Sequence, residues 1–207
     1  MQLYGYFRSG NTRKVRLCLA ELGVHHELVV VDLAAGEQRS ADYLRLNPNG
    51  VVPTLVDGEL VLWESSAILL YLAETYPHGG LLPQALDERA RVYKWLVWQP
   101  ATFNPPRQRL VAEMAKPDAA RDARAIAALR ATIDRNLEIL AEALGGSDYL
   151  LGRYTLADLV MLPHLAALRD AGLALPGTVH RYLERLAARP AWQAIQNWPG
   201  GHGREPL

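Results

Sequence analysis

The chain has 207 residues, 50% of them hydrophobic, and its 22 basic and 22 acidic side chains leave no formal net charge. Balanced charge provides no long-range field that would favour DNA, RNA or an anionic membrane as a partner. No segment approaches the roughly 18 consecutive apolar residues of a membrane-spanning helix, and the first residues lack the apolar core of a signal peptide. We therefore expect a soluble cytoplasmic protein with two small domains that binds a small molecule or another protein.

The first part of the chain predicts alternating strands and helices. Residues 2–6 alternate in the manner of a strand, and a helix follows from Asn11 until Gly23 ends it. Residues 26–33, HELVVVDL, form a continuous β-branched run of the kind buried in a parallel sheet. Together these segments predict a right-handed βαβ unit, and a short helix is expected over residues 41–46.

A β-hairpin is predicted over residues 52–63, VPTLVDGELVLW. Two apolar runs flank Asp57 and Gly58, which favour a two-residue turn with positive φ at both positions. This pair of strands is therefore antiparallel, and a helix that ends before Pro77 follows it. The predicted order of elements is βαβ, α, ββ, α.

The second part of the chain carries no strand signal. A segment rich in glycine and proline, PHGGLLP, separates the two parts, and we expect a domain over residues 1–77, a linker over 78–86 and an all-helical domain over 87–207. One long amphipathic helix is marked by apolar residues three or four places apart, namely Ile126, Leu129, Ile133, Leu137, Leu140 and Leu144. Thr155 and Asp158 predict a carboxylate variant of the capping box at the start of another helix.

Cysteine and histidine usage restricts the chemistry of the protein. Cys18 is the only cysteine in the sequence, so an intramolecular disulfide, a CxxC redox pair and a cysteine-based zinc site are excluded. It lies on the apolar stripe of the first helix, where we expect a buried thiol with a raised pKa. The six histidines lack the spacing of metal ligands, so we predict no metal.

Ser9 and Asn11 stand where the first strand gives way to the first helix. No histidine or aspartate lies nearby in the sequence, so a Ser-His-Asp mechanism is not expected. A hydroxyl or amide at a helix N-terminus can donate to a bound anion, or it can cap the helix. The residues alone leave open which of the two side chains caps the helix and which faces an anion.

These segments together resemble a cytosolic glutathione transferase, and the resemblance covers nearly the whole chain. The serine before the first helix, NPNGVVPTL, ESSAILLYLAETYP and YTLADL occur in the order and spacing that the family uses. The start YGYFRSGNTRKVRL is most similar to the serine-type branches, such as the zeta, theta and bacterial groups. The resemblance implies a thioredoxin-like α/β domain followed by an all-α domain, a homodimer, and a role in detoxification.

The resemblance also implies that glutathione is the co-substrate and that its thiolate attacks a soft electrophile. Ser9 or Asn11 would stabilise the thiolate, and no general base is needed because the ligand carries the nucleophile. A cis bond between Val52 and Pro53 would present the backbone of Val52 to the cysteinyl part of glutathione, as one added rung of antiparallel sheet. Taken alone, Pro53 fits equally well as the first residue of a strand.

The two ends of glutathione are assigned in the same way. Glu64 and Ser65 would bind the γ-glutamyl end, although both also suit a simple capping pair. Gln38 would bind the glycyl end. Theta-like relatives have a lysine where this chain has Val51, so another cation would be needed there. The candidates are Arg13 and Arg39, although both fit equally well as parts of a basic surface that faces solvent.

The predicted first helix of the helical domain departs from the family pattern. Three prolines are expected to interrupt it, namely Pro100, Pro105 and Pro106. We expect Trp98, Phe103 and Arg107 to line a pocket for the electrophile, or to belong to the core. Two other functions remain open. One is a glutathione-dependent peroxidase or disulfide reductase without a protein cysteine, and the other is a non-catalytic glutathione-binding protein.

Overall fold

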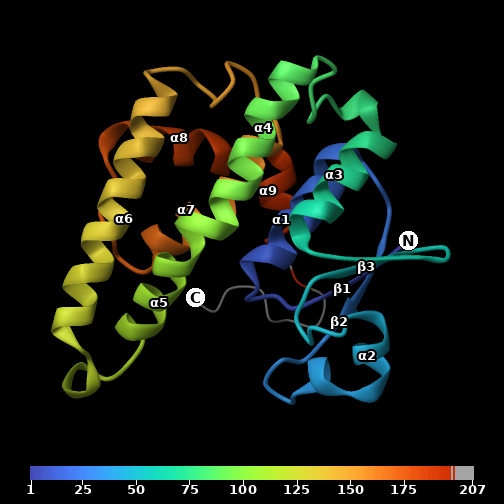
Figure 1. Ribbon diagram of the computed structural model, residues 1–207, viewed down its shortest axis with the longest axis horizontal. Helices are drawn as coiled ribbons and strands as arrows, with labels where there is room; N and C mark the ends of the chain where they lie inside the picture. Colours follow the sequence, from blue (N-terminus) through green and yellow to red (C-terminus); the bar gives the residue numbers. More distant parts are fainter. Residues whose placement is uncertain (197, 199–207) are drawn as a thin grey trace. The chain divides into compact units, whose positions relative to one another are not determined.

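The computed structural model describes residues 1–196 and Trp198 (Figure 1). The chain forms two compact units, one made of Met1–Leu82 and the segment that begins at Pro190, the other of Pro83–Arg189. The division differs from the sequence-based boundaries in two places. Residues 78–82, expected in the linker, belong to the first unit, and so does the segment from Pro190, which was expected in the helical domain.

The first unit is a four-stranded sheet with helices, in the strand order β2-β1-β3-β4. β1 runs parallel to β2 and antiparallel to β3, and β4 runs antiparallel to β3. The elements are β1 (Gln2–Gly5), α1 (Gly10–Leu22), β2 (Glu27–Val30), α2 (Ala41–Leu46), β3 (Thr54–Asp57), β4 (Leu60–Trp63), α3 (Ser65–Thr75) and α9 (Pro190–Ala194). The predicted order of strands and helices is therefore confirmed, as is the thioredoxin-like α/β fold.

Side chains on the two faces of the sheet pack against different helices. α1 and α3 pack side by side (Figure 1). The core that they share with the sheet consists of apolar side chains at most 1% exposed, among them Leu3, Val15, Leu19, Leu55, Ile68 and Leu72. Tyr4, the neighbour of Leu3, packs instead against Tyr43 of α2, with ring centroids 6.2 Å apart. This alternation is what a strand with helices on both faces requires.

Two details of the predicted sheet are wrong. β2 was expected to be buried, but it is an edge strand with only β1 beside it, and Val30 is 42% exposed. In the hairpin, Asp57 pairs with Leu60, so the two turn residues are Gly58 and Glu59. The turn therefore lies one residue later than the predicted turn at Asp57 and Gly58. Of these two turn residues only Gly58 has positive φ, at 60°. Glycine alone adopts this φ without a steric cost, and the second turn residue does not need it.

The second unit is helical. Its helices are α4 (Leu86–Trp98), α5 (Asn104–Met114), α6 (Ala123–Leu144), α7 (Leu156–Asp170) and α8 (Gly177–Ala187). Every residue of α7 from Leu156 to Leu168 is buried, and α7 packs against α4, α5 and α8. The central helix is thus buried on all sides because the neighbouring helices pack around it. The predicted capping box is confirmed at its start, with Thr155 as N-cap and Asp158 as its partner.

The long first helix is interrupted in the region of the three prolines, as expected, although the chain stays helical across the interruption. A π-helical turn over Gln99–Phe103 contains Pro100 and joins α4 to α5. Pro105 and Pro106 lie in the first turn of α5. Amides in a first helical turn have no partner within the helix, so proline is tolerated there.

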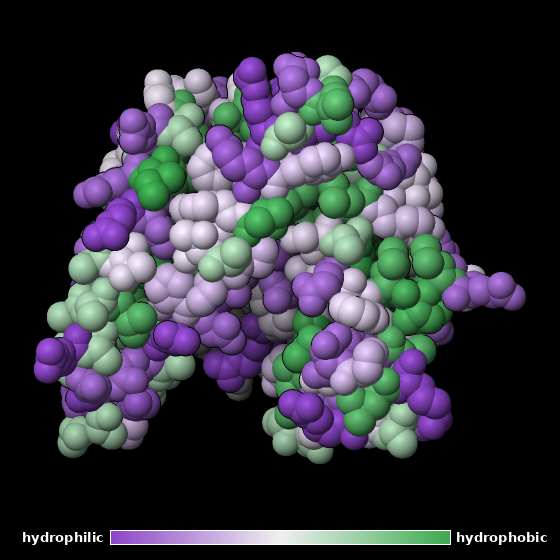
Figure 2. All heavy atoms as spheres, in the orientation of Figure 1, coloured by the Kyte–Doolittle hydropathy of each residue, from purple (hydrophilic) through white to green (hydrophobic). Residues whose placement is uncertain are grey.

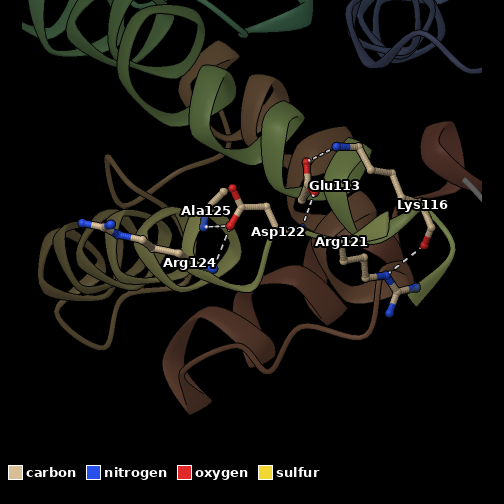
Figure 3. Close-up of polar contacts among 6 residues, drawn as sticks. All are labelled: Glu113, Lys116, Arg121, Asp122, Arg124 and Ala125. Atoms are coloured by element: carbon tan, nitrogen blue, oxygen red, sulfur yellow. Dashed lines mark hydrogen bonds and ion pairs between the residues drawn. The ribbon is translucent and has the colours of Figure 1, made fainter. Parts of the chain in front are cut away.

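Polar contacts fix the connection between α5 and α6 (Figure 3). Asp122 is the N-cap of α6, and its carboxylate accepts the backbone N–H groups of Arg124 and Ala125 at 2.9 and 3.0 Å. Glu113, near the end of α5, accepts the backbone N–H of Asp122 at 2.8 Å and the ammonium of Lys116 at 2.6 Å. The Asp122 carboxylate therefore caps α6, while the Glu113 carboxylate ties the end of α5 to that capping residue.

No helix in the described part of the chain combines the length and apolar character that crossing a membrane requires.

Candidate functional site

Three segments with candidate residues meet at one end of the sheet. Thr54, the first residue of β3, pairs with Tyr4 on one side and with Trp63 on the other. The chain that leaves β1 therefore runs to Ser9, the chain that enters β3 contains Val52 and Pro53, and the chain that leaves β4 runs directly into Glu64 and Ser65. Sheet pairing thus gathers these residues, which stand far apart in the sequence.

Ser9 is the N-cap of α1. Its Oγ accepts the backbone N–H of Thr12 at 3.2 Å, and its own backbone N–H donates to Tyr6 O at 3.1 Å. A hydroxyl that accepts one hydrogen bond still has its hydrogen to donate. This hydrogen lies at the positive end of the α1 dipole, where an anion is favoured. Capping the helix and donating to a thiolate are therefore compatible roles for Ser9.

Glycine at position 5 allows α1 to approach β1. A methyl group at Gly5 would collide with Cγ2 of Thr12. Thr12 is fully buried, and its Oγ1 accepts the backbone N–H of Tyr6 at 3.3 Å. The start of the helix is thereby fixed to the end of the strand, with the turn that carries Ser9 between them.

Asn11 lies in the first turn of α1 and is partly exposed. Its side chain makes no hydrogen bond to any residue that the structure describes. Both its amide and the Ser9 hydroxyl therefore remain candidates for a contact with an anion at this helix end.

The peptide bond between Val52 and Pro53 is cis. The side chain of Val52 is buried in a cluster with Val31 and Tyr43, against which Tyr6 also packs. Within residues 1–196 and Trp198, the backbone N–H and C=O of Val52 have no hydrogen-bond partner. An unpaired backbone beside a sheet can pair with an extended peptide.

A buried polar network holds the segment in front of Val52. The Tyr43 hydroxyl donates to Val51 O at 2.7 Å and lies 2.9 Å from Thr54 Oγ1. The Asn47 amide donates to the same two oxygens, at 2.8 and 3.2 Å. All three polar side chains are at most 5% exposed. Tyr43, Asn47 and Thr54 were not among the predicted site residues, although the segment NPNGVVPTL contains the last two. The hydrogen bonds between them follow from the fold and are not visible in the sequence.

Glu64 is the only residue other than glycine with positive φ in the described part of the chain, with φ 69° and ψ 106°. It is the N-cap of α3, but its side chain makes no capping hydrogen bond. Such conformations cost about 1 to 3 kcal/mol and are found disproportionately at ligand sites. Glu64 is exposed, and the hydroxyl of the buried Ser65 makes no hydrogen bond within the described residues. The simple capping role considered for this pair is therefore not what the structure shows.

Gln38 and Arg39 lie next to the loop that leads to Val52. A methyl group at Gly50 would be 3.1 Å from both Arg39 Nη1 and Gln38 O. Gln38 Nε2 lies 3.5 Å from Leu33 O, whereas its buried Oε1 has no partner within the described residues. Arg13, the other candidate cation, is occupied elsewhere, because its guanidinium stacks on Trp192 and donates to Gln196 at 2.6 Å.

The three candidates for an electrophile pocket lie together in the second unit. The rings of Trp98 and Phe103 are 5.5 Å apart, and Trp98 also contacts Trp95 at 5.1 Å. Phe103 is fully buried, so it belongs to the core and offers no surface to a ligand in this structure. Trp98 and Arg107 keep exposed atoms.

Arg107 is a partly buried cation without an acidic partner in the described part of the chain. Its Nε donates to Asn104 Oδ1 at 3.0 Å. Burial lowers the pKa of Arg107 to about 10. Phe103, Arg107 and Leu110 recur at the spacing of one helix face, and the first and last are fully buried. The charge therefore stands on the buried face of α5.

Cys18 is fully buried, and burial strongly raises the pKa of its thiol. It is therefore not the nucleophile that a redox mechanism through a protein cysteine would need. Among the residues that the structure describes, no three histidine, cysteine, aspartate or glutamate side chains are grouped as a metal ion would require.

A family model described as "Glutathione S-transferase, N-terminal domain" matches residues 1–74, and one described as "Glutathione S-transferase, C-terminal domain" matches residues 123–198. The two matches cover most of the chain, and their order agrees with the α/β and helical units. The chain belongs to the glutathione S-transferase family.

Individual relatives support the same assignment. Glutathione S-transferase 3 of Zea mays is 36% identical over 204 residues, covering 93% of this chain and 91% of that protein. Glutathione S-transferase GstB of Escherichia coli is 33% identical over 199 residues, covering 93% and 96%. The structure is similar to that of the theta class glutathione S-transferase from Xanthomonas axonopodis pv. citri with glutathione bound, with a TM-score of 0.83, 36% identity and coverage of 93% and 95%.

Proposed function

We propose that the protein is a glutathione transferase that binds glutathione at the end of its sheet and activates it as a thiolate. The observation that carries this proposal is the unpaired backbone of Val52, in the same cluster as Tyr6, whose carbonyl accepts the Ser9 amide. A cysteinyl residue paired with Val52 would add one antiparallel rung to the sheet. The Ser9 hydroxyl is the donor proposed for its sulfur.

Ionisation of the bound thiol is the proposed contribution of the helix end. A free cysteine thiol has a pKa of about 8.5, and each unit of depression is worth about 1.36 kcal/mol. One hydroxyl and the N-terminus of α1 supply about one to two units, which makes the thiolate abundant at neutral pH. The thiolate then forms a carbon–sulfur bond with the electrophile, and the leaving group departs with its bonding electrons. The thiol proton passes to solvent.

The ends of glutathione have separate proposed partners. The γ-glutamyl carboxylate would accept hydrogen bonds from the Ser65 hydroxyl and the first amides of α3, and its ammonium would pair with the exposed Glu64. The glycyl end would lie near Gln38, whose Oε1 can accept an amide N–H. Arg39, beside the same loop, would replace the lysine that is absent at Val51.

A soft electrophile would bind against the helical unit, at Trp98 and Arg107. We also propose a cytoplasmic homodimer with a role in detoxification. An exposed apolar surface favours association of two copies, since Leu60, Val61 and Trp63 of the edge strand β4 are 37% to 41% exposed. Figure 2 shows hydrophobic residues gathered over the β3–β4 hairpin, on the right of the view. Sedimentation equilibrium would show a single species of twice the chain mass.

Two other functions are compatible with the same site. A glutathione-dependent peroxidase or disulfide reductase would use the thiols of two glutathione molecules, because the buried Cys18 cannot serve as one of the two reacting thiols. A non-catalytic glutathione-binding protein would bind without turnover, and the missing lysine at Val51 favours this alternative. Parallel assays with 1-chloro-2,4-dinitrobenzene and with cumene hydroperoxide separate the three.

The proposal is tested by retention on immobilised glutathione, followed by the conjugation assay. We expect retention, elution by free glutathione, and turnover with the chlorinated aromatic compound. A protein that is folded by circular dichroism but does not bind millimolar glutathione would contradict the entire proposal. Binding with peroxidase activity alone, or with no activity, would select one of the alternatives.

A further inference from the structure

Within the first unit, the segment from Pro190 packs against α1 through two pairs of arginine and tryptophan. The Arg13 guanidinium lies 4.5 Å from the centre of the Trp192 ring, and the Arg16 guanidinium lies 4.6 Å from that of Trp198. Both tryptophans are at most 7% exposed. The two arginines are three residues apart and therefore lie on one face of α1.

Hydrogen bonds fix the same segment more specifically than stacking does. Arg16 Nη1 donates to Ile195 O at 2.9 Å, and Arg13 Nη2 donates to Gln196 Oε1 at 2.6 Å. The amide of Gln196 in turn donates to Trp192 O at 2.7 Å, which ties the segment to itself. Each guanidinium thus has an aromatic face and an oxygen acceptor from this segment.

The segment offsets an unfavourable arrangement of charge. Burial and the neighbouring Arg13 lower the pKa of Arg16 to about 10. A buried cation is tolerated when its hydrogen-bonding groups are satisfied. Because Trp192, Ile195, Gln196 and Trp198 supply these contacts, the packing depends on specific partners and is not a general apolar contact.

Only one of the two tryptophans also reaches the turn that carries Ser9. The rings of Trp198 and Phe7 are 6.3 Å apart, inclined by 54°, and Phe7 contacts Tyr6 at 4.7 Å. Phe7 lies two residues before Ser9, inside the turn closed by the bond from Ser9 N to Tyr6 O. Trp198 therefore touches both α1, through Arg16, and the turn in front of α1.

We infer that Trp198 is a positioning residue for the Ser9 hydroxyl: wedged between Arg16 and Phe7, it holds the turn Tyr6–Ser9 against the first turn of α1. Trp192 makes an equivalent contact with the helix but has none with the turn among its described contacts. The inference rests on the proposed function, because the consequence of a displaced Ser9 is a less ionised thiol of bound glutathione.

The two tryptophans form a matched pair for the test. Trp198→Ala and Trp192→Ala each remove one indole from an arginine of α1, so both should lower the melting temperature. Only Trp198→Ala should raise the pKa of bound glutathione, by about half a unit, which lowers the ratio of thiolate to thiol about threefold. The pKa is measured by ultraviolet titration of the thiolate in the complex.

A double-mutant cycle separates positioning from general destabilisation. In a Ser9→Ala background Trp198→Ala should no longer change the thiolate pKa, although it should still lower the melting temperature. Trp198→Phe, which keeps an aromatic ring, should restore most of the ionisation. If Trp198→Ala does not fold, Phe7→Leu removes the same contact from the other side and enters the same cycle.

The outcomes are distinguishable. Wild-type protein that binds no glutathione would overturn the proposed function and this inference with it. Wild-type protein that binds and ionises glutathione, while Trp198→Ala leaves the thiolate pKa unchanged, would overturn the inference alone. So would an equal shift in Trp192→Ala, or a Trp198→Ala shift that persists without Ser9.

Discussion

The Tyr182 hydroxyl lies 2.9 Å from Asp158 Oδ1 and joins α8 to the first turn of α7. Asp158 also accepts the backbone N–H groups of Leu150 and Thr155, each at 2.9 Å. The carboxylate is fully buried, so it connects the loop before α7, the helix start and α8 in one place. It does more than the capping box predicted from the sequence.

Replacing Asp158 should therefore cost more than replacing its partner in the capping box. Thr155→Ala should cost about 0.5 to 2 kcal/mol, the range for an N-cap. Asp158→Ala leaves four donor groups, on Leu150, Thr155 and Tyr182, without this acceptor and should cost about 3 kcal/mol or more. Urea denaturation measures both, and glutathione affinity should be unchanged in each variant. Equal costs would show that the additional contacts contribute nothing.

The same carboxyl group should give stability a pH dependence of defined sign. Burial raises the pKa of Asp158 above its usual value, despite the opposing hydrogen bonds. The folded state then holds this proton more tightly than the unfolded chain, so ionisation favours unfolding. Relative to Asp158→Asn, the wild-type protein should lose stability as the pH rises from about 3 through the raised pKa, and no further above it. If the wild-type protein instead gains stability relative to Asp158→Asn as the pH rises, the pKa of Asp158 is not raised in the folded state.

The thiolate contact is decided by comparing Ser9→Ala with Asn11→Ala. We expect Ser9→Ala to raise the pKa of bound glutathione by about one unit or more and to slow conjugation at neutral pH about tenfold to a thousandfold, as for loss of one preorganised donor. Affinity for glutathione should change little. A shift in Asn11→Ala alone would make Ser9 a helix cap, and no shift in either variant would assign ionisation to the helix amides.

Cys18→Ala should leave turnover nearly unchanged. The thiol is buried and its pKa is raised, so it has no role as a nucleophile. The lost packing should cost about 1 kcal/mol, measured by chemical denaturation. Collapse of activity with intact folding would mean that the reactive sulfur is the protein's own.

The polar network in front of Val52 should affect glutathione binding more than ionisation. Tyr43→Phe removes the donor to Val51 O but keeps the ring in its cluster. We expect a KM for glutathione raised about fivefold or more, the effect of about 1 kcal/mol from one buried hydrogen bond, with an unchanged thiolate pKa. Tyr71→Phe, whose hydroxyl bonds to Asp57 instead, is the control. Equal KM values for the two variants would show that the polar network does not contribute to glutathione binding.

Arg107→Met should stabilise the helical unit by about 1 kcal/mol. The change removes a partly buried charge that has no acidic partner among the described residues, and an apolar side chain of similar length fills its place. Arg109→Met, at an exposed position of the same helix, should change stability by less than about 0.5 kcal/mol. A lower kcat/KM for the electrophile in Arg107→Met alone would support its proposed place in the pocket. Lost stability would show that the bond to Asn104 outweighs desolvation.

Features set by neighbouring residues could be predicted from the sequence. The capping box at Thr155 and the hairpin at Gly58 depend on residues a few places apart, so their patterns are visible locally. The position of the hairpin turn was predicted one residue too early. The register of the paired strands, and not the Asp57-Gly58 dipeptide alone, determines which two residues form the turn. The edge position of Val30 also depends on the order of the strands, which no single segment contains.

The arrangement of the candidate site depended on contacts between distant segments. Glu64 is recognisable in the sequence as a residue before a helix, but its positive φ follows from how β4 enters α3. Tyr43 lies eight residues from Val51, the oxygen of which it binds. The family resemblance supplied candidate residues, whereas their hydrogen-bond partners came only from the fold.

The packing of the segment from Pro190 against α1 has a consequence for biosynthesis. A ribosome makes the four strands and α3 first, then more than a hundred residues of the helical unit, and only then the residues that cover Arg13 and Arg16. The nascent α/β unit therefore lacks these aromatic and oxygen partners of Arg13 and Arg16 until the segment from Pro190 emerges. Synthesis of the segment from Pro190, and not completion of the sheet, therefore finishes this unit.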